Sequence, residues 1–96
     1  MKQLTIFCSA DLSDLVRDAL IHAGIQGFIK VPHAVGSKPD ATWEHGRYPT
    51  WEAEIFMTPA PDEAVERVVA RLKDHCGKCE VEPCLHILVS ALEAVY

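Results

Sequence analysis

Basic residues are scarce in this sequence, and no two of them are adjacent. The 96 residues include 9 Lys and Arg against 14 Asp and Glu, which gives a formal net charge of −5. The nearest basic pair is Arg71 and Lys73, so there is no basic stripe that could neutralise a phosphate backbone. The sequence therefore predicts no nucleic-acid partner.

Long apolar runs and a targeting segment are also missing. No apolar stretch approaches the roughly 18 residues that a membrane-spanning helix needs. Residues 1–8 lack the apolar core and the cleavage site of a secretory signal peptide. We therefore expect a cytoplasmic protein with no direct membrane insertion, and in that compartment cysteines are more typical of thiols or metal ligands than of structural disulfides.

The chain is long enough for one domain only, which we place at residues 1–96. Hydrophobic residues make up 49% and charged residues 24%, which is typical of a globular protein. Repeats, linkers and low-complexity segments are absent. A domain of this size buries a modest share of its surface, so a second copy or another stabilising partner is expected.

Segments whose apolar residues recur at every second position, as in strands, are interspersed with segments in which they recur every three or four positions, as in helices. Period-2 alternation or a short apolar run predicts four strands, at residues 2–8, 27–35, 50–58 and 85–90. Spacings of three and four predict two helices, at residues 12–23 and 61–76. The expected order is therefore strand, helix, strand, strand, helix, strand.

Residues that typically begin or end an element support these boundaries. Asp11 is an expected N-cap of the first helix, and Gly24 an expected end. Pro61 is expected at the first position of the second helix, which Gly77 would end. Pro32 indicates that the second strand lies at an edge of the sheet or contains a bulge.

This βαββαβ order is typical of the α+β ferredoxin-like sandwich, in which both helices cover one face of an antiparallel sheet. Right-handed crossovers give the strand order 4-1-3-2. The face without helices must meet water or a neighbouring chain. We expect that face to carry Phe7, Phe28, Phe56 and Leu88.

A long polar connection between the second and third strands is the first candidate functional segment. It runs from Gly36 to Pro49 and carries several aromatic and ionisable side chains, and a loop of this length in so short a domain is usually functional. We expect its large aromatics and its Arg to bind a partner protein, through Trp43, His45, Arg47 and Tyr48. Arg47 could also bind a carboxylate, bicarbonate or phosphate. Trp51, just beyond the loop, is interpreted as a core residue.

The cysteines are the second candidate. Cys76, Cys79 and Cys84 have the spacing C-x2-C-x4-C, and Cys8 ends the first strand, which the predicted topology places beside the start of the fourth. Thiolates at this spacing predict a soft-metal site made of Cys76, Cys79, Cys84 and Cys8. Two alternatives remain open, a redox pair of Cys79 with Cys76 or Cys84, and ordinary core packing.

Three segments resemble the PII-like signalling proteins. GIQGFIKVPHAVG (residues 24–36) is similar to the strand that enters the family's T-loop, and EHGRYPTWEAEIFM (residues 44–57) to the exit from that loop. CLHILVSALEAVY (residues 84–96) is similar to the family's last strand and tail. This tail has no Lys or Arg, so the classical phosphate contacts of the family have no counterpart there. The CutA proteins, linked to metal tolerance, have a similar architecture.

The resemblance implies a homotrimer whose subunit clefts bind a small ligand, an adenine nucleotide or a soft transition metal. It implies ligand-binding roles for Gly36, His45, Arg47 and Lys78, and a T-loop that contacts a regulated protein such as a membrane transporter. We therefore expect a PII-like regulator. The alternatives are a heavy-metal-binding accessory protein and a thiol-based redox protein. Because the sequence has neither a nucleophile elbow nor a Gly-rich phosphate loop, we expect no enzyme.

Overall fold

Four strands and two helices follow one another as the hydrophobic spacing predicts. The computed structural model describes residues 1–37, 50–75 and 84–96. The described elements are β1 (Lys2–Ser9), α1 (Ser13–His22), β2 (Ile29–Ser37), β3 (Thr50–Ala60), α2 (Asp62–Leu72) and β4 (Leu85–Ala91). Two short 3-10 turns, Ala10–Leu12 and Lys73–His75, precede α1 and follow α2. None of the described helices is long and apolar enough to cross a membrane.

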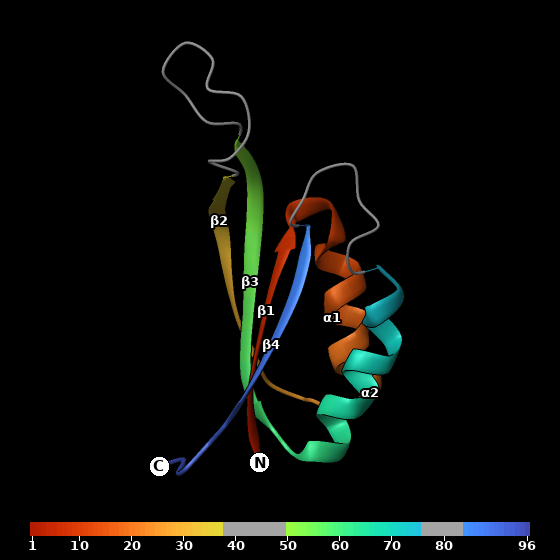
Figure 1. Ribbon diagram of the computed structural model, residues 1–96, viewed down its shortest axis with the longest axis vertical. Coiled ribbons are helices and arrows are strands. Elements are labelled where there is room, and N and C mark those ends of the chain that lie inside the picture. The colour runs from red at the N-terminus through yellow and green to blue at the C-terminus, as the bar shows by residue number, and fades with distance from the viewer. Residues whose placement is uncertain (38–49, 76–83) are drawn as a thin grey trace.

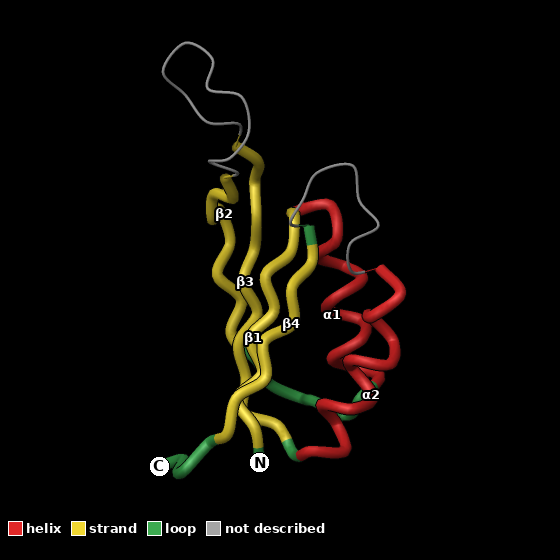
Figure 2. The backbone as a smooth tube through the Cα atoms, viewed as in Figure 1, coloured by secondary structure: helices red, strands yellow, loops and turns green. Residues whose placement is uncertain are grey.

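The strands form one antiparallel sheet in the order β2-β3-β1-β4. Both helices lie against the same face of this sheet, and no described helix lies on the opposite face (Figure 1). Figure 2 shows the resulting two layers, strands on one side and helices on the other. The predicted ferredoxin-like α+β fold and its strand order are therefore confirmed. The predicted T-loop, between β2 and β3, lies mostly in residues 38–49, outside the described residues.

The core lies between the sheet and the helices, and strand alternation selects its members. Leu4 and Ile6 of β1 are at most 1% exposed, whereas the side chains between and after them point to the other face. The helices contribute residues three and four positions apart, namely Val16, Ala19, Leu20, Val65, Val68 and Leu72. Burial of each large aliphatic side chain contributes about 1.5–3 kcal/mol, so this interface is the main source of stability.

Phe56 and Phe28 lie on the helix side, which corrects the expectation that they occupy the open face. Phe56 is 1% exposed, and the Phe28 ring packs against it with centroids 5.5 Å apart. The strand period gives the reason, because Phe56 shares its face with the buried residues Thr58 and Ala60. Phe7 and Leu88 are 40% and 47% exposed on the open face, as predicted.

A bulge in the edge strand β2 changes which residues share a face. The register with β3 shifts between Val31 and Ala34, and His33 in the bulge has a φ of 60°. The bulge or edge position expected from Pro32 is therefore confirmed. Because of the shift, Val35 pairs with Glu52, on the helix side of β3. Val35 therefore lies on the opposite face of the sheet from Val31, although the two are four positions apart.

The helix ends differ from the predicted ones by a few residues. Asp11 lies inside the 3-10 turn, and α1 begins after Leu12 with no side-chain cap. Gly24 ends α1 with a φ of 86°, as expected of a glycine at that position. Pro61 caps α2 from outside it, and its carbonyl accepts hydrogen bonds from the main-chain N–H groups that follow. Gly77, the expected end of the second helix, lies outside the described residues.

The assignment of Phe56 to the core predicts a difference between two adjacent positions. Phe56→Ala should lower the free energy of unfolding by about 3–5 kcal/mol, because it opens a cavity in the core. The neighbouring control Met57→Ala, at a side chain 41% exposed on the open face, should cost less than about 1 kcal/mol. Urea unfolding checks both, at concentrations where the variants have the wild-type mass by light scattering. Equal losses would contradict the assignment of faces.

Candidate functional site

The sheet face without helices, here called the free face, carries an unusual number of exposed apolar side chains. These are 40% to 67% exposed and come from all four strands: Phe7, Ile29, Val31, Met57 and Leu88. Cross-strand pairing groups them, since Ile29 lies opposite Met57 and Thr5 opposite Leu88. A continuous apolar surface of this kind is typical of an interaction site.

A hollow of about 270 Å³, here called the sheet pocket, lies in the free face where β2 ends and β3 begins. Residues from all four strands line it: Phe7, Cys8, Ala34, Val35, Gly36, Ser37, Trp51, Ala53, Ile55 and His86. The last described residue before the connection between β2 and β3 is Ser37, the end of β2. A ligand in this pocket would therefore contact the base of that connection.

Small residues form the hollow, and an indole ring lies over one of them. Ala34 pairs with Ala53, and Gly36 pairs with Trp51. A Cβ atom built at Gly36 would overlap the Trp51 ring, so only glycine leaves room for the indole in this position. Trp51 is half-buried on the free face and lines the pocket. The interpretation of Trp51 as a core residue is therefore wrong.

The chemistry of the pocket wall is aromatic and uncharged apart from a histidine. Phe7 and His86 pair across β1 and β4, and with Trp51 they provide three aromatic rings at one hollow. Among the described residues that line it there is no Lys, Arg, Asp or Glu. A wall of this kind suits a flat heteroaromatic ring, which gains stacking energy there. An anionic group on the same ligand would need cations from elsewhere.

Of the predicted ligand-binding residues, the structure places Gly36 at the pocket. The other three, His45, Arg47 and Lys78, lie outside the described residues, as do the predicted partner-binding residues Trp43 and Tyr48. The sequence reading missed Phe7, Trp51 and His86 as pocket residues. The sequence did contain a signal for Phe7 and His86, because alternation along their strands assigns both side chains to the free face.

Of the two described cysteines, one is a free thiol and the other is disulfide-bonded. Cys8 is free and Cys84 is disulfide-bonded, and both are 2% exposed. Cys76 and Cys79 lie outside the described residues. The start of β4 lies beside the end of β1 as predicted, because the Ser9 N–H donates to the Cys84 carbonyl at 2.8 Å.

The expectation of free thiols or metal ligands does not hold at Cys84 in this state. A sulfur in a disulfide is not a thiolate and binds a soft metal only after reduction. The described residues contain no group of three or more His, Cys, Asp or Glu side chains that could hold a metal ion. With two of its four ligands outside those residues, the metal site stays a prediction.

Burial raises the pKa of the Cys8 thiol to about 11, with the negative charges of Glu54 and then Asp11 adding to the effect. Glu54 pairs with Cys8 across β1 and β3, and its Oε2 atom lies 3.3 Å from Lys30 Nζ. The thiolate is therefore strongly disfavoured at neutral pH. Cys8 is suited to a packing role rather than to nucleophilic or redox chemistry.

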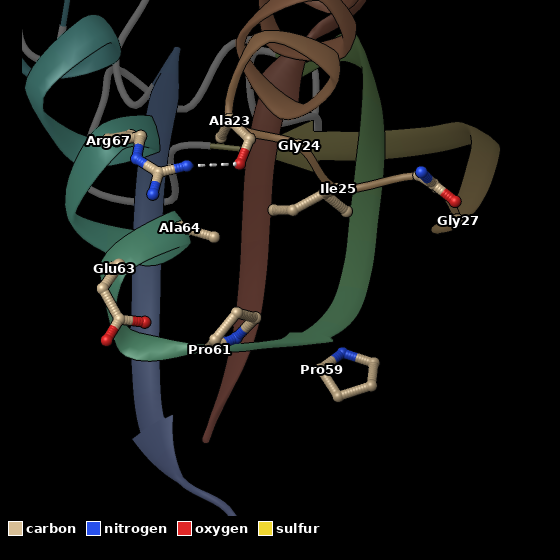
Figure 3. A pocket seen from close by; sticks show the side chains of 10 residues that line it. Ala23, Gly24, Ile25, Gly27, Pro59, Pro61, Glu63, Ala64 and Arg67 are labelled. Atoms are coloured by element: carbon tan, nitrogen blue, oxygen red, sulfur yellow. Dashed lines mark hydrogen bonds between the residues drawn. The ribbon is translucent and has the colours of Figure 1, made fainter.

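A second hollow lies away from the free face, between the C-terminal end of α1 and the N-terminal part of α2 (Figure 3). It has a volume of about 500 Å³ and is here called the helix-end pocket. Arg67 is the one basic residue among the described residues that line it. Its Nη1 atom donates to the Ala23 carbonyl at 3.1 Å, the bond drawn as a dashed line in Figure 3. This bond links α2 to the end of α1, so the guanidinium already has a structural role.

Comparison by sequence finds no matching family model and no matching curated protein. Comparison of structures finds CPII, described as a nitrogen regulatory PII-like protein, from Thiomonas intermedia K12. A structure of it bound to ADP, AMP and bicarbonate has a TM-score of 0.71 and 16% identity, covering 93% of this chain and 88% of that chain. One bound to ADP and bicarbonate has a TM-score of 0.69 and 18% identity, with 92% and 81% covered.

The apo form of the same protein has a TM-score of 0.68 and 16% identity, covering 92% of this chain and 84% of that chain. At these identities the likeness shows the fold and not the ligand. This chain therefore has the PII-like fold, and the resemblance predicted from its sequence is confirmed at that level.

The contact between Gly36 and Trp51 predicts a cost for a single methyl group. Gly36→Ala should lower the free energy of unfolding by about 1–3 kcal/mol and displace the indole, because the new Cβ overlaps the ring. The control is Gly27→Ala, where a Cβ meets nothing within 4 Å, and stability should be unchanged or raised by up to about 1 kcal/mol. Chemical unfolding and near-ultraviolet circular dichroism check both. In a Trp51→Ala background the cost at Gly36 should disappear, and its persistence there would contradict the contact.

The raised pKa of Cys8 predicts a loss of stability in alkali. Above pH 9 the thiol ionises in the unfolded chain but stays neutral in the folded protein until about pH 11. The stability that Cys8 contributes is thus complete below pH 9 and falls as the pH rises toward 11, by roughly 2 kcal/mol. Unfolding free energies between pH 8 and 10.5 should fall more steeply for the wild type than for Cys8→Ala. Parallel curves would show that the thiol is not buried as described.

Proposed function

We propose that this chain is a divergent PII-like regulator that binds a small ligand in the sheet pocket. The observation that carries the proposal is the position of this pocket at the base of the predicted T-loop. Gly36 and Ser37 line it and are the last described residues before that connection. A ligand held there acts on both strand ends from which the loop leaves. Its binding would be coupled to the order of the loop, which is a common switching mechanism.

An adenine nucleotide is the ligand class that this pocket fits best. Phe7, Trp51 and His86 offer ring faces to a nucleobase, and stacking on an aromatic side chain contributes about 1–3 kcal/mol per base. The printed ligands of the CPII structures, ADP, AMP and bicarbonate, support the same class. The phosphates or a small anion would then be held by Arg47 and Lys78, as the resemblance implies.

The free face supports a homotrimer with the ligand in a cleft between subunits. Its exposed apolar side chains extend from the sheet pocket along the sheet and would be covered by a neighbouring copy. Covering this face would also bury additional apolar surface, since a 96-residue domain alone buries only a modest fraction of its surface. The sheet pocket is open toward that neighbour, so a second copy would complete its wall.

The proposed output is a contact between the T-loop and a regulated protein such as a membrane transporter, through Trp43, His45, Arg47 and Tyr48. In this proposal the protein is not an enzyme, because the ligand changes a binding equilibrium and is not converted. The proposed readout is therefore affinity for a partner, with and without the ligand.

The binding site is tested by calorimetric titration of ADP, with and without bicarbonate, into the wild type and two variants. Trp51→Ala should weaken ADP binding by about 5- to 150-fold, because a stacking surface is lost. Arg67→Ala, in the competing helix-end pocket, should leave the affinity unchanged. Native mass spectrometry of the same samples should show a trimer with bound nucleotide.

The two variants separate the alternatives. Loss of binding in Arg67→Ala but not in Trp51→Ala would place the site at the helix ends and contradict the proposal. Absence of ADP binding to the wild type at millimolar concentrations would refute the nucleotide class. A monomer under native conditions would refute the subunit cleft.

A further inference from the structure

The helix-end pocket has no ligand in the proposed function, and it lies at the opposite end of the sheet from the sheet pocket. Pro59, near the end of β3, lines the helix-end pocket, whereas Trp51, near the start of β3, lines the sheet pocket. The described residues that line the two pockets include none in common. The volume of about 500 Å³ falls within the roughly 300–1,000 Å³ that is typical of small-molecule sites.

The lining of this pocket combines buried apolar side chains with two opposite charges. Ala23, Ile25 and Ala64 are each at most 7% exposed. Glu63 and Arg67, both exposed, are the charged residues among the described residues that line it. A largely apolar wall with a few polar groups that orient the ligand is the usual composition of a small-molecule site.

Glu63 and Arg67 occupy positions at which opposite charges on a helix usually pair. They lie four residues apart in α2, with the acid first, which is the favourable order for an ion pair. The ion pairs among the described residues nevertheless do not include one between them. Figure 3 shows the guanidinium directed to the Ala23 carbonyl and the Glu63 carboxylate pointing away from it. Two opposite charges therefore line one pocket without neutralising each other.

Arg67 keeps hydrogen-bond donors for a ligand although it already contacts Ala23. A guanidinium has five N–H donors, and the bond to the Ala23 carbonyl uses one of them. The planar fork that remains suits a carboxylate, and the Glu63 carboxylate can accept from an ammonium group. A dicarboxylate or a diamine would bring a like charge toward Glu63 or Arg67, so the pocket favours a zwitterion.

We propose that the helix-end pocket binds a free α-amino acid, with its carboxylate at Arg67, its ammonium group at Glu63 and an apolar side chain against Ile25. The Cβ atoms of residues four apart on a helix are about 5–6 Å from each other. A carboxylate and an ammonium group on one carbon atom can bridge that gap with hydrogen bonds to both sides. Residues within a peptide chain lack these two charges. The inference goes beyond the proposed function and does not rest on it.

The ligand class is tested on the wild-type chain with L-leucine and two analogues that each lack one charge, L-leucine methyl ester and N-acetyl-L-leucine. Each is titrated into isotope-labelled protein and followed by N–H resonances. L-Leucine should bind with a Kd of about 1 mM or lower. Each analogue should bind at least about fivefold more weakly. The shift changes should occur at the amides of Gly24 and Gly27 and at the Arg67 Nε–H, with the Trp51 indole unchanged.

The site is tested with pairs of variants on α2. Glu63→Gln keeps the shape of the side chain and removes its charge, so it should weaken L-leucine binding at least about fivefold. Its control is Glu66→Gln, at an exposed residue that does not line the pocket, and affinity should be unchanged. Arg67→Lys keeps the charge but not the planar fork and should also weaken binding, whereas the matched change Arg71→Lys should not.

Three outcomes would overturn the inference. These are equal binding of L-leucine and both analogues, equal affinity of Glu63→Gln and the wild type, and no binding of L-leucine at ten times the expected Kd. Shift changes centred on Trp51 would also refute it, because they would place the amino acid in the sheet pocket. The analogue series uses the wild type, so it decides the question even if a variant does not fold. Failure of ADP to bind would refute the proposed function and leave this inference standing.

Discussion

One geometric constraint governs this molecule, namely that both helices pack on the same face of a four-stranded sheet. Alternate residues of β1 and β3 are buried against the helices, and the residues between them point to a face that neither α1 nor α2 covers. The first set supplies the stability. The second set includes Phe7 and Met57, and it is more apolar than is usual for side chains that face solvent. The proposed subunit contacts and the proposed ligand site both follow from this second set.

The sheet pocket depends on local departures from regular strand structure. The bulge at His33 changes the register of β2, so that Gly36 comes to lie opposite Trp51. The missing Cβ at Gly36 then leaves room for the indole on the free face. The connection that follows Ser37 begins beside this hollow. The same few residues thus shape the pocket and form the end of β2, from which the predicted T-loop begins.

The fold was predictable from the sequence because strand and helix periods are strong local signals, and because few topologies connect a βαββαβ order. Phe56 was misplaced because an alternating strand does not say which of its faces is buried when both are apolar. Trp51 was misplaced for the same reason, since it alternates with Ala53 and Ile55, and the sequence does not say whether that face meets the helices. The pocket is lined by residues from four strands. Strand pairing determines which residues meet there, and their spacing along the chain does not reveal it. Most predicted site residues lie outside the described residues, so those predictions stand as they were made.

The most direct test of the central claim is a titration of the isotope-labelled protein with ADP, followed by amide and indole N–H resonances. The largest chemical-shift changes should occur at the Trp51 indole and at the amides of Phe7, Gly36 and His86, with little change at Glu63 and Arg67. Changes centred on Glu63 and Arg67 would contradict the account, because they would place the ligand at the helix ends instead of on the free face.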